Sequence, residues 1–345
     1  MPRCAHSCIR LEPNEKGNRV RMSFENPKVV VVGAGAMGSL FGGLLAQHGL
    51  DVTLVDVWQQ HVDAINCNGL RLVGHGGERT VRVKATTDAQ AVRSADVVLF
   101  QCKAFANENA ARSVRHLFDG PTVAISFQNG LGNEETLGRI VGESHMLAGL
   151  TAQGAIVESA GVVRNFGDLP TYIGELSAGH SERARAIADA FTRHGLPTHA
   201  SDDIKKLKWQ KLLGNAALGA VSAATDMTSA QMVAIPELRA IILRALDETA
   251  AVARASGVML TDDEKRAIFD KLTRTDAGGT GASKSSMAAD IVLRRKTEID
   301  TIHGSVARLG RERGVPTPTL DTMIAIVKAL EAKYSQPGAA SETQQ

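Results

Sequence analysis

Residues 28–56 constrain the fold of this chain more than any other segment. A run of β-type residues at 28–32 leads directly into a glycine-rich turn, an apolar segment follows, and a second β-type run at 52–55 ends at Asp56. Strand, glycine turn, helix, strand and acid in this order are typical of a dinucleotide-binding α/β domain. The turn consists of Gly33, Ala34, Gly35, Ala36, Met37 and Gly38.

Each glycine of this turn has a separate predicted role. Gly33 permits the tight turn, Gly35 lets the backbone approach a pyrophosphate, and Gly38 lets the helix pack close to the strand. The new helix directs its unpaired N–H groups and the positive end of its dipole at the phosphates. We therefore assign residues 33–38 to cofactor binding. The alternative is a tight turn in some other α/β protein.

Asp56 bears on the choice of cofactor. An acid at the end of the second strand accepts hydrogen bonds from ribose hydroxyls, whereas a 2′-phosphate needs a cation there. No Lys or Arg follows Asp56 before Arg71. These residues favour NADH over NADPH, and the alternative is a solvated acid at the end of a strand.

Composition excludes several classes of protein. The chain has 345 residues, 43% of them hydrophobic and 22% charged, with a formal net charge of +2. This balance predicts a soluble globular protein with no bias toward nucleic acid or membrane. No apolar stretch reaches the roughly 18–20 residues that span a bilayer, and residues 1–4 lack the apolar core of a signal peptide. We expect a cytoplasmic protein.

The four cysteines indicate neither a metal site nor a disulfide. Cys4 and Cys8 flank a histidine but lack a second ligand pair, so no metal site is expected. Cys67 and Cys102 are expected to be small buried hydrophobic residues.

The pattern along the chain predicts two domains with flexible ends. Residues 1–25 are expected to be a disordered leader, 26–200 a Rossmann-type dinucleotide-binding domain, 201–334 an all-helical domain for substrate and dimerisation, and 335–345 a disordered tail. The helical half contains Ala- and Leu-rich stretches at 204–224, 235–256, 262–272, 285–313 and 320–334. The predicted fold class is therefore α/β followed by an all-helical C-terminal domain.

Lys211 and Asn215 form a candidate catalytic pair. They are four residues apart on a predicted helix, so they share a face. The residues after Lys211 are mostly apolar, and a partly desolvated lysine has a lowered pKa that suits a general acid. The alternative is a lysine whose stem is buried and whose amine reaches water, beside a structural asparagine.

Ser286 and Glu298 form a second candidate group. A hydroxyl at a helix start can bind a carboxylate, and Glu298 lies within an apolar stripe. The alternatives are an ordinary N-cap and an exposed ion pair. Twelve residues of straight helix would separate these two residues by ~18 Å, far more than a small oxo acid spans. We therefore expect the helix to break near residues 294–296, with Thr297 capping a new helix that starts at Glu298. The alternative is that Ser286 lies in a loop that folds back over the site.

In this order and spacing, these motifs resemble the ketopantoate reductase (2-dehydropantoate 2-reductase) family, from about residue 28 to residue 332. The shared segments are residues 33–38, 101–104, 129–132, 211–215, 285–287 and 297–300. The resemblance implies an NADPH-dependent oxidoreductase of pantothenate biosynthesis that acts on a CH–OH group and reduces ketopantoate to pantoate.

The resemblance implies a role for each matching position. Lys211 corresponds to the general acid that protonates the substrate oxygen. Asn215 and Ser286 correspond to substrate contacts, Ser286 toward the carboxylate. Glu298 corresponds to the acid that holds the cofactor ribose and the substrate hydroxyl.

Three further positions correspond to residues near the cofactor. Lys103 and Asn129 match residues that line the cofactor and orient nicotinamide and substrate. Ala155 matches a backbone contact to the cofactor. The family is not expected to need a metal.

Two positions depart from the family's well-known members. Gly219 stands where those carry a second asparagine, and no basic residue follows Asp56 to take the NADP phosphate. Two other functions therefore stay open: a related dehydrogenase of another small hydroxy or oxo acid, and a non-catalytic dinucleotide sensor. A small-molecule 2-oxo acid is the expected partner, and the sequence leaves a homodimer open.

Overall fold

The chain divides into two structural units in the computed structural model, which describes residues 10–12, 21–276 and 278–335. The first unit contains the described residues up to Ile204 except the loop Asn129–Gly132, which belongs with Lys205 and the residues after it in the second unit. The predicted boundary at residue 200 lies close to this division. The Asn129–Gly132 loop, which the prediction placed in the first domain, groups with the second unit, because Gly130 packs directly on the backbone of Thr301.

The first unit is built on an eight-stranded sheet. Its spatial order is β14-β13-β10-β9-β8-β3-β4-β7, and all neighbours are parallel except β10 and β13. The strands are β3 (Val29–Val32), β4 (Val52–Val55), β7 (Lys84–Thr86), β8 (Val97–Phe100), β9 (Val123–Ser126), β10 (Met146–Thr151), β13 (Thr171–Gly174) and β14 (Thr198–Ala200). From β7 to β10 this is the doubly wound order of dinucleotide-binding folds.

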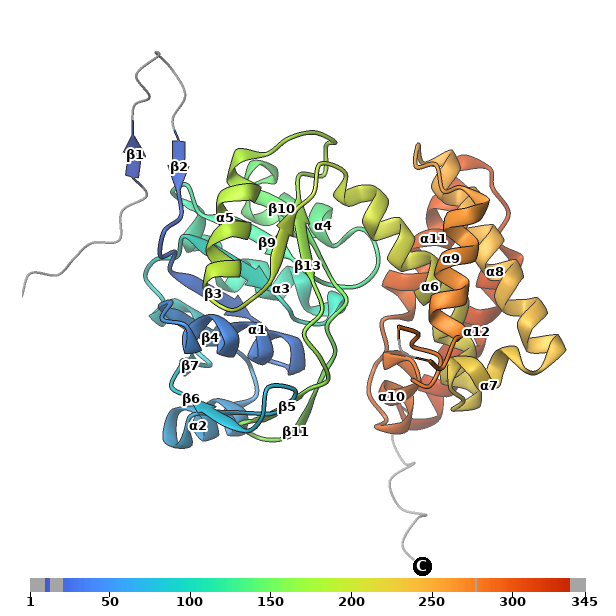
Figure 1. The fold of residues 1–345 in the computed structure, drawn as a ribbon, viewed down its shortest axis with the longest axis horizontal. Coiled ribbons are helices and arrows are strands. Elements are labelled where there is room, and N and C mark those ends of the chain that lie inside the picture. The colour runs from blue at the N-terminus through green and yellow to red at the C-terminus, as the bar shows by residue number, and fades with distance from the viewer. Residues whose placement is uncertain (1–9, 13–20, 277, 336–345) are drawn as a thin grey trace, which may run out of the picture. The chain divides into compact units, whose positions relative to one another are not determined.

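A second sheet has the order β11-β12-β5-β6. Its strands are β5 (Leu70–Gly74), β6 (Arg79–Val81), β11 (Ala155–Ser159) and β12 (Val162–Asn165). Helix α1 (Ala36–Gln47) contacts strands of both sheets (Figure 1). Its glycines allow this close packing, because a Cβ would come within 2.4 Å of Leu54 at Gly42 and within 2.9 Å of Leu70 at Gly43.

The remaining helices of the first unit are α2 (Gln59–Asn68), α3 (Asn107–Ser113), α4 (Asn133–Val141) and α5 (Glu182–Arg193), with the short 3-10 turns η1 (Ala89–Ala91), η2 (Ala104–Ala106), η3 (Arg115–Phe118) and η4 (Glu143–His145). Within the predicted disordered leader, β1 (Arg10–Glu12) and β2 (Arg21–Ser23) pair in antiparallel register. Strands of three residues are too short to show a periodic pattern in the sequence, so this pairing was not predicted. The other residues of the leader up to position 20 lie outside the described part of the chain.

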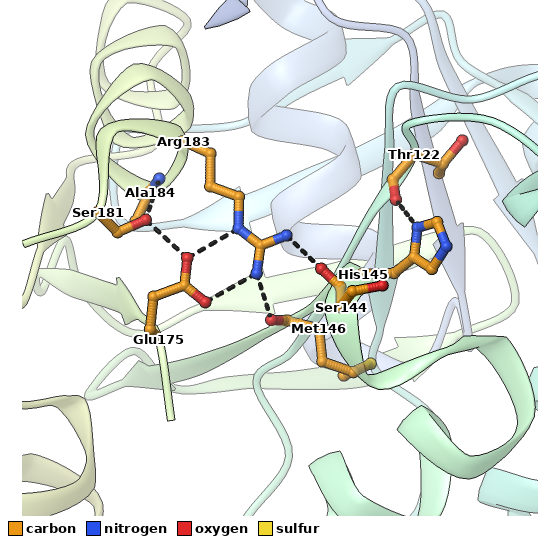
Figure 2. A network of polar contacts seen from close by, with 8 residues as sticks. All are labelled: Thr122, Ser144, His145, Met146, Glu175, Ser181, Arg183 and Ala184. Carbon is orange, nitrogen blue, oxygen red and sulfur yellow. Dashed lines mark hydrogen bonds and ion pairs between the residues drawn. The ribbon is translucent and has the colours of Figure 1, made fainter. Parts of the chain in front are cut away.

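A polar network fixes the start of α5 to the sheet (Figure 2). Arg183 donates to both carboxylate oxygens of Glu175, at 2.8 and 2.7 Å, and to the carbonyls of Ser144 and Met146. Ser181 caps the helix and also donates to Glu175. Burial alone would raise the pKa of Glu175, but the bonds from Arg183 and Ser181 lower it below its ordinary value. The ion pair therefore links β10, β13 and α5.

Every regular element assigned among the described residues of the second unit is a helix, as predicted. Its helices are α6 (Ile204–Thr225), α7 (Ser229–Val233), α8 (Pro236–Ala255), α9 (Asp262–Thr273), α10 (Ser286–Val292), α11 (Ile299–Arg313) and α12 (Pro318–Ser335). Helix α6 starts at the boundary with the first unit and contributes most of its length to the helical core. Gly214 lets α9 approach α6, because a Cβ there would lie 2.2 Å from Leu272.

The predicted break between Ser286 and Glu298 is confirmed. Helix α10 ends at Val292, Arg294 adopts a left-handed backbone with φ 52°, and α11 starts at Ile299. Thr297 accepts a hydrogen bond from the Ile299 N–H at 3.2 Å. The new helix begins one residue later than predicted, with Glu298 in the N-cap position.

None of the described helices is long and apolar enough to cross a bilayer. Of the predicted C-terminal tail, Ser335 ends α12 and residues 336–345 lie outside the described part of the chain.

Candidate active site

The glycine turn lies at the carboxyl end of β3, between β4 and β8. Gly33 has φ +93°, and a Cβ there would lie 2.4 Å from the backbone nitrogen of Cys102. A Cβ on Gly38 would lie 1.9 Å from the Gly33 carbonyl oxygen. The predicted roles of Gly33 in the turn and of Gly38 in close packing therefore agree with the structure. Ligands of doubly wound sheets bind at this edge, where the strand order reverses.

Gly35 differs from its two neighbours in the turn. It is exposed, has φ −63°, and an added Cβ would meet no atom within 4 Å. It is the N-cap of α1, and no side chain caps the helix there. The first N–H groups of α1 are therefore available to an anion, and Gly35 keeps the approach to them open. These residues fit the pyrophosphate of a dinucleotide.

A buried histidine supports this turn, although the sequence interpretation did not identify it. The Gly161 N–H donates to Nδ1 of His61 at 3.0 Å, so Nε2 carries the proton and donates to Ser39 Oγ at 3.0 Å. Ser39 in turn donates to the Ala34 carbonyl at 2.7 Å. Burial lowers the pKa of His61, and the charge of Asp56 opposes this shift. A neutral ring keeps the donor and acceptor roles that this chain of bonds requires.

Asp56 lies one residue after β4 and is half-buried. One of its oxygens accepts a hydrogen bond from the Trp58 N–H at 2.9 Å. The Trp58 ring stacks on His61 with centroids 5.0 Å apart. The carboxylate is thereby held at the carboxyl edge of β4, in the position expected of a ribose-binding acid.

Lys103 follows the carboxyl end of β8, next to Cys102. A buried amide network holds this end, in which Gln128 donates to the Cys102 carbonyl at 2.6 Å and to the Asn107 side chain at 2.5 Å. Asn107 donates onward to Asn133 at 2.9 Å. These amides were missed because they are far apart in sequence and meet only where the strands end.

Two other predictions concern individual residues of the first unit. Ala155 is the first residue of β11 and pairs with Asn165 of β12. Cys102 is half-buried, whereas Cys67 is exposed near the end of α2, so the prediction of a buried Cys67 was wrong. The local sequence shows a helix there but does not show which face meets the core.

The helical unit contains a polar row along one face of α6. Lys211, Asn215 and Gly219 follow one another at intervals of four residues on α6. Ser222 lies on the same face, because each residue of an α-helix turns it by about 100°. Ser222 Oγ accepts a hydrogen bond from the Ser285 N–H at 3.1 Å, and Ser285 Oγ donates to the Gly219 carbonyl at 3.1 Å. The start of α10 is therefore attached to this row.

Lys211 has the perturbed acidity expected of a catalytic lysine. The pKa of Lys211 is lowered from 10.5 to about 8, mainly by burial and also by the charge of Lys208, while the charge of Glu298 opposes both. Glu298 is only 9% exposed. A lysine with a pKa near neutrality can give up its proton and regain it within the working range of an enzyme.

Ser286 is the exposed first residue of α10. The N-cap is Ser285, whose Oγ accepts a hydrogen bond from the Ala288 N–H at 3.0 Å. The alternative interpretation of Ser286 as an ordinary N-cap is therefore wrong, because Ser285 occupies the N-cap position of α10.

Asn129 belongs to a loop that packs on α11. The Leu131 N–H donates to the Thr301 carbonyl at 3.3 Å. Gly130 has φ +83°, and a Cβ there would lie 2.2 Å from the same carbonyl oxygen. This contact places Asn129 in the same unit as the polar row of α6 and Glu298.

The structure thus groups the predicted residues into two sets, one in each unit. The turn, Asp56, Lys103 and Ala155, which are predicted to bind the cofactor alone, belong to the nucleotide-binding unit. The residues predicted for catalysis and substrate binding belong to the helical unit, and two of them, Asn129 and Glu298, are also predicted to contact the cofactor. A doubly wound sheet with this turn, followed by a helical unit that carries a buried lysine, is typical of NAD(P)-dependent oxidoreductases.

Sequence comparison identifies the family. The sequence profile of ketopantoate reductase PanE/ApbA matches residues 29–178, and the profile of its C-terminal domain matches residues 203–331. A 2-dehydropantoate 2-reductase of Halobacterium salinarum is 32% identical over 87% of this chain and 98% of its own length. One from Pyrococcus abyssi is 31% identical over 88% and 98%. The chain belongs to the ketopantoate reductase PanE/ApbA family.

Solved structures agree with this assignment. A PanE/ApbA family ketopantoate reductase from Ralstonia eutropha aligns with a TM-score of 0.81 and 32% identity over 89% of this chain and 99% of its own. D-mandelate dehydrogenase in complex with NADH and anilino(oxo)acetate aligns with a TM-score of 0.83 and 27% identity over 90% and 99%.

Proposed function

We propose that this protein reduces 2-dehydropantoate (ketopantoate) to pantoate with NAD(P)H, and that Lys211 is the general acid. The observation that carries the proposal is the lowered pKa of Lys211, on the same helix face as Asn215 and next to the charge of Glu298. Membership of the family and the names of its relatives support the substrate.

Each of these residues has a separate role in the proposed reaction. The open N-terminus of α1 at Gly35 holds the dinucleotide pyrophosphate, and Asp56 accepts from the adenosine ribose. When bound, the reduced nicotinamide supplies a hydride to the carbonyl carbon. Lys211 donates its proton to the carbonyl oxygen, so that a hydroxyl rather than an alkoxide forms. Glu298 keeps Lys211 cationic before this transfer and accepts from ribose and substrate hydroxyls.

The other residues orient the ligands. Asn215 and Ser286 donate hydrogen bonds to the substrate, with Ser286 toward its carboxylate. Asn129 and Lys103 orient nicotinamide and substrate, and Ala155 contacts the cofactor through its backbone. None of these contacts requires a metal.

The proposal is tested by an assay of the purified protein with a panel of branched 2-oxo acids, each with NADH and with NADPH. Ketopantoate is expected to give the highest kcat/KM. Benzoylformate, the oxo acid of mandelate, is the matched competitor, because D-mandelate dehydrogenase has the same fold. A preference for benzoylformate would support the alternative, a dehydrogenase of another small acid. Turnover of no 2-oxo acid together with tight NADH binding would support a sensor.

The pH dependence of the two reaction directions should differ in sign. Reduction needs protonated Lys211, so its kcat is expected to be constant below pH 8 and to fall about tenfold per pH unit above the pKa of about 8. Oxidation of pantoate needs the neutral amine, so its kcat should rise up to the same pH. Stopped-flow measurement of the chemical step at constant ionic strength tests this. The same slope in both directions would exclude Lys211 as the group that titrates.

Asp56 is expected to disfavour NADPH by repelling its 2′-phosphate. Asp56→Ala should lower the ratio of the NADPH to the NADH dissociation constant by about tenfold, because the charge that repels the 2′-phosphate is removed. The matched control is Asp63→Ala on the exposed face of α2, which should leave the ratio unchanged. Tighter binding of NADPH than of NADH by the native protein would contradict the prediction.

The proposal includes a cytoplasmic location and a homodimer. A ketopantoate reductase from Staphylococcus aureus is described as dimeric. Light scattering of the full chain at several concentrations measures the oligomeric state directly.

A further inference from the structure

The buried histidine beneath the glycine turn connects two parts of the proposed cofactor site. His61 has no exposed surface. It donates to Ser39, which in turn donates to the Ala34 carbonyl at 2.7 Å. On its other side it accepts a hydrogen bond from the N–H of Gly161, in the turn between β11 and β12. Strand β11 begins at Ala155, so the ring joins the glycine turn to the hairpin that carries the proposed backbone contact to the cofactor.

The hydrogen bond to Ala34 fixes the direction of the next N–H group. The described peptide bonds are trans, and in a trans peptide the C=O and the following N–H point in opposite directions. The Ala34 carbonyl points to Ser39, which is fully buried. The Gly35 N–H therefore points away from this buried side, as an N–H that binds an anion from solvent must.

Glycine at position 35 makes this hydrogen bond necessary. Glycine adopts backbone angles that are closed to other residues, so the peptide between Ala34 and Gly35 can rotate at little cost unless another group holds it. The Ser39 hydroxyl holds the Ala34 carbonyl only when its proton is directed there. His61 ensures this direction, because its Nε2–H donates to the Ser39 oxygen and leaves the hydroxyl proton for the carbonyl. An apolar side chain would fill the same space without directing that proton.

We propose that His61 is a positioning residue for the dinucleotide: through Ser39 it holds the peptide between Ala34 and Gly35 with its N–H directed at the pyrophosphate. The inference rests on the proposed function, because it requires that the turn binds a dinucleotide. The role needs one ring nitrogen that accepts and one that donates. Burial lowers the pKa of His61 against the opposing effects of Asp56 and the Ala34 backbone, and so favours the neutral ring that has both.

Two carboxamide replacements of His61 separate positioning from packing. Asparagine places its amide near the position of Nδ1, where it can accept from Gly161 but does not reach Ser39. Glutamine places its amide nitrogen near the position of Nε2, where it can donate to Ser39. Calorimetric titration with NADH should give a Kd raised roughly 3- to 10-fold in His61→Asn, the effect of one lost hydrogen bond, and close to the native value in His61→Gln. Equal Kd values in the two variants would overturn the inference.

Ser39→Ala tests the second link of the chain with a smaller change. We expect the same rise in the Kd of NADH, and no further rise when His61→Asn is added, because both substitutions break one chain of bonds. With NADH saturating, kcat should stay within about twofold of the native value, because the proposed proton donor Lys211 belongs to the other unit. Additive effects of the two substitutions on Kd would contradict a shared role.

Thr122→Ala is the matched control. Thr122 is also a buried hydroxyl, and it donates to the carbonyls of Ala95 and Leu117 at 2.7 and 2.6 Å. It directly precedes β9, which runs parallel to β8 and β3, so it lies at the sheet edge opposite the glycine turn. Its replacement should lower the thermal midpoint and leave the Kd of NADH unchanged.

The native protein distinguishes this inference from the proposed function. If it binds neither NADH nor NADPH, the proposed function and the inference both fail. If it binds NADH and Ser39→Ala binds NADH equally well, the inference fails alone. The Ser39→Ala result also decides the inference where a His61 variant does not fold.

Discussion

Lys211→Met is expected to lower kcat for 2-oxo acid reduction by roughly 10²–10⁴-fold, the usual contribution of a general acid. Methionine keeps the length and apolar stem of the side chain but cannot deliver a proton to the carbonyl oxygen. Dinucleotide affinity should be unchanged, because the glycine turn and Asp56 belong to the other unit. Single-turnover kinetics with saturating substrate measure the chemical step directly.

The same substitution should stabilise the fold. The pKa of Lys211 falls from 10.5 to about 8 on folding, so the unfolded chain binds more protons between these values. Burying the charged amine lowers the free energy of unfolding. This destabilisation is fully present below pH 8 and diminishes as the pH rises toward 10.5. Lys211→Met removes this cost, and its thermal midpoint at neutral pH is expected to exceed that of the native protein.

Lys205→Met provides the control on the same helix. Lys205 is exposed and donates to the Ser256 carbonyl at 3.1 Å, so its replacement should change neither kcat nor stability markedly. A loss confined to KM in Lys211→Met would reassign Lys211 to substrate anchoring. A native kcat would exclude it from catalysis.

Local pattern was sufficient to predict much of this molecule. The glycine turn was recognisable from its spacing, and at Gly33 and Gly38 the glycine is required because the neighbouring backbone approaches more closely than a Cβ allows. The order of the helices followed from apolar spacing. The break before Glu298 was predictable because one small substrate cannot span a straight helix from Ser286.

What the sequence did not show depends on contacts between distant segments. The Asn129–Gly132 loop joins the helical unit through Thr301, about 170 residues later in the chain. The support of the glycine turn by His61, and the place of His303 next to Gly219, depend on helix packing in the same way. The local signals were a serine directly after the glycine turn and a histidine among the apolar positions of a predicted helix.

The second large effect is expected at Gly35, where folding and binding can be separated. A methyl group at Gly35 would meet no protein atom within 4 Å, so Gly35→Ala should fold as the native chain does. It would, however, occupy the space through which a pyrophosphate reaches the N–H groups of α1. We expect the dissociation constant of NADH to rise on the order of 10²-fold, because the anion loses its closest backbone contacts.

Gly33→Ala, in contrast, should mainly destabilise the fold rather than weaken NADH binding. Its Cβ would lie 2.4 Å from the Cys102 backbone at φ +93°, so the main loss is expected in the thermal midpoint. Gly120→Ala is the control, because Gly120 also has open space around it but lies away from the turn. Calorimetric titration with NADH and thermal unfolding on all three variants measure the two effects separately. Native NADH affinity in a folded Gly35→Ala would show that the pyrophosphate does not bind at this helix start.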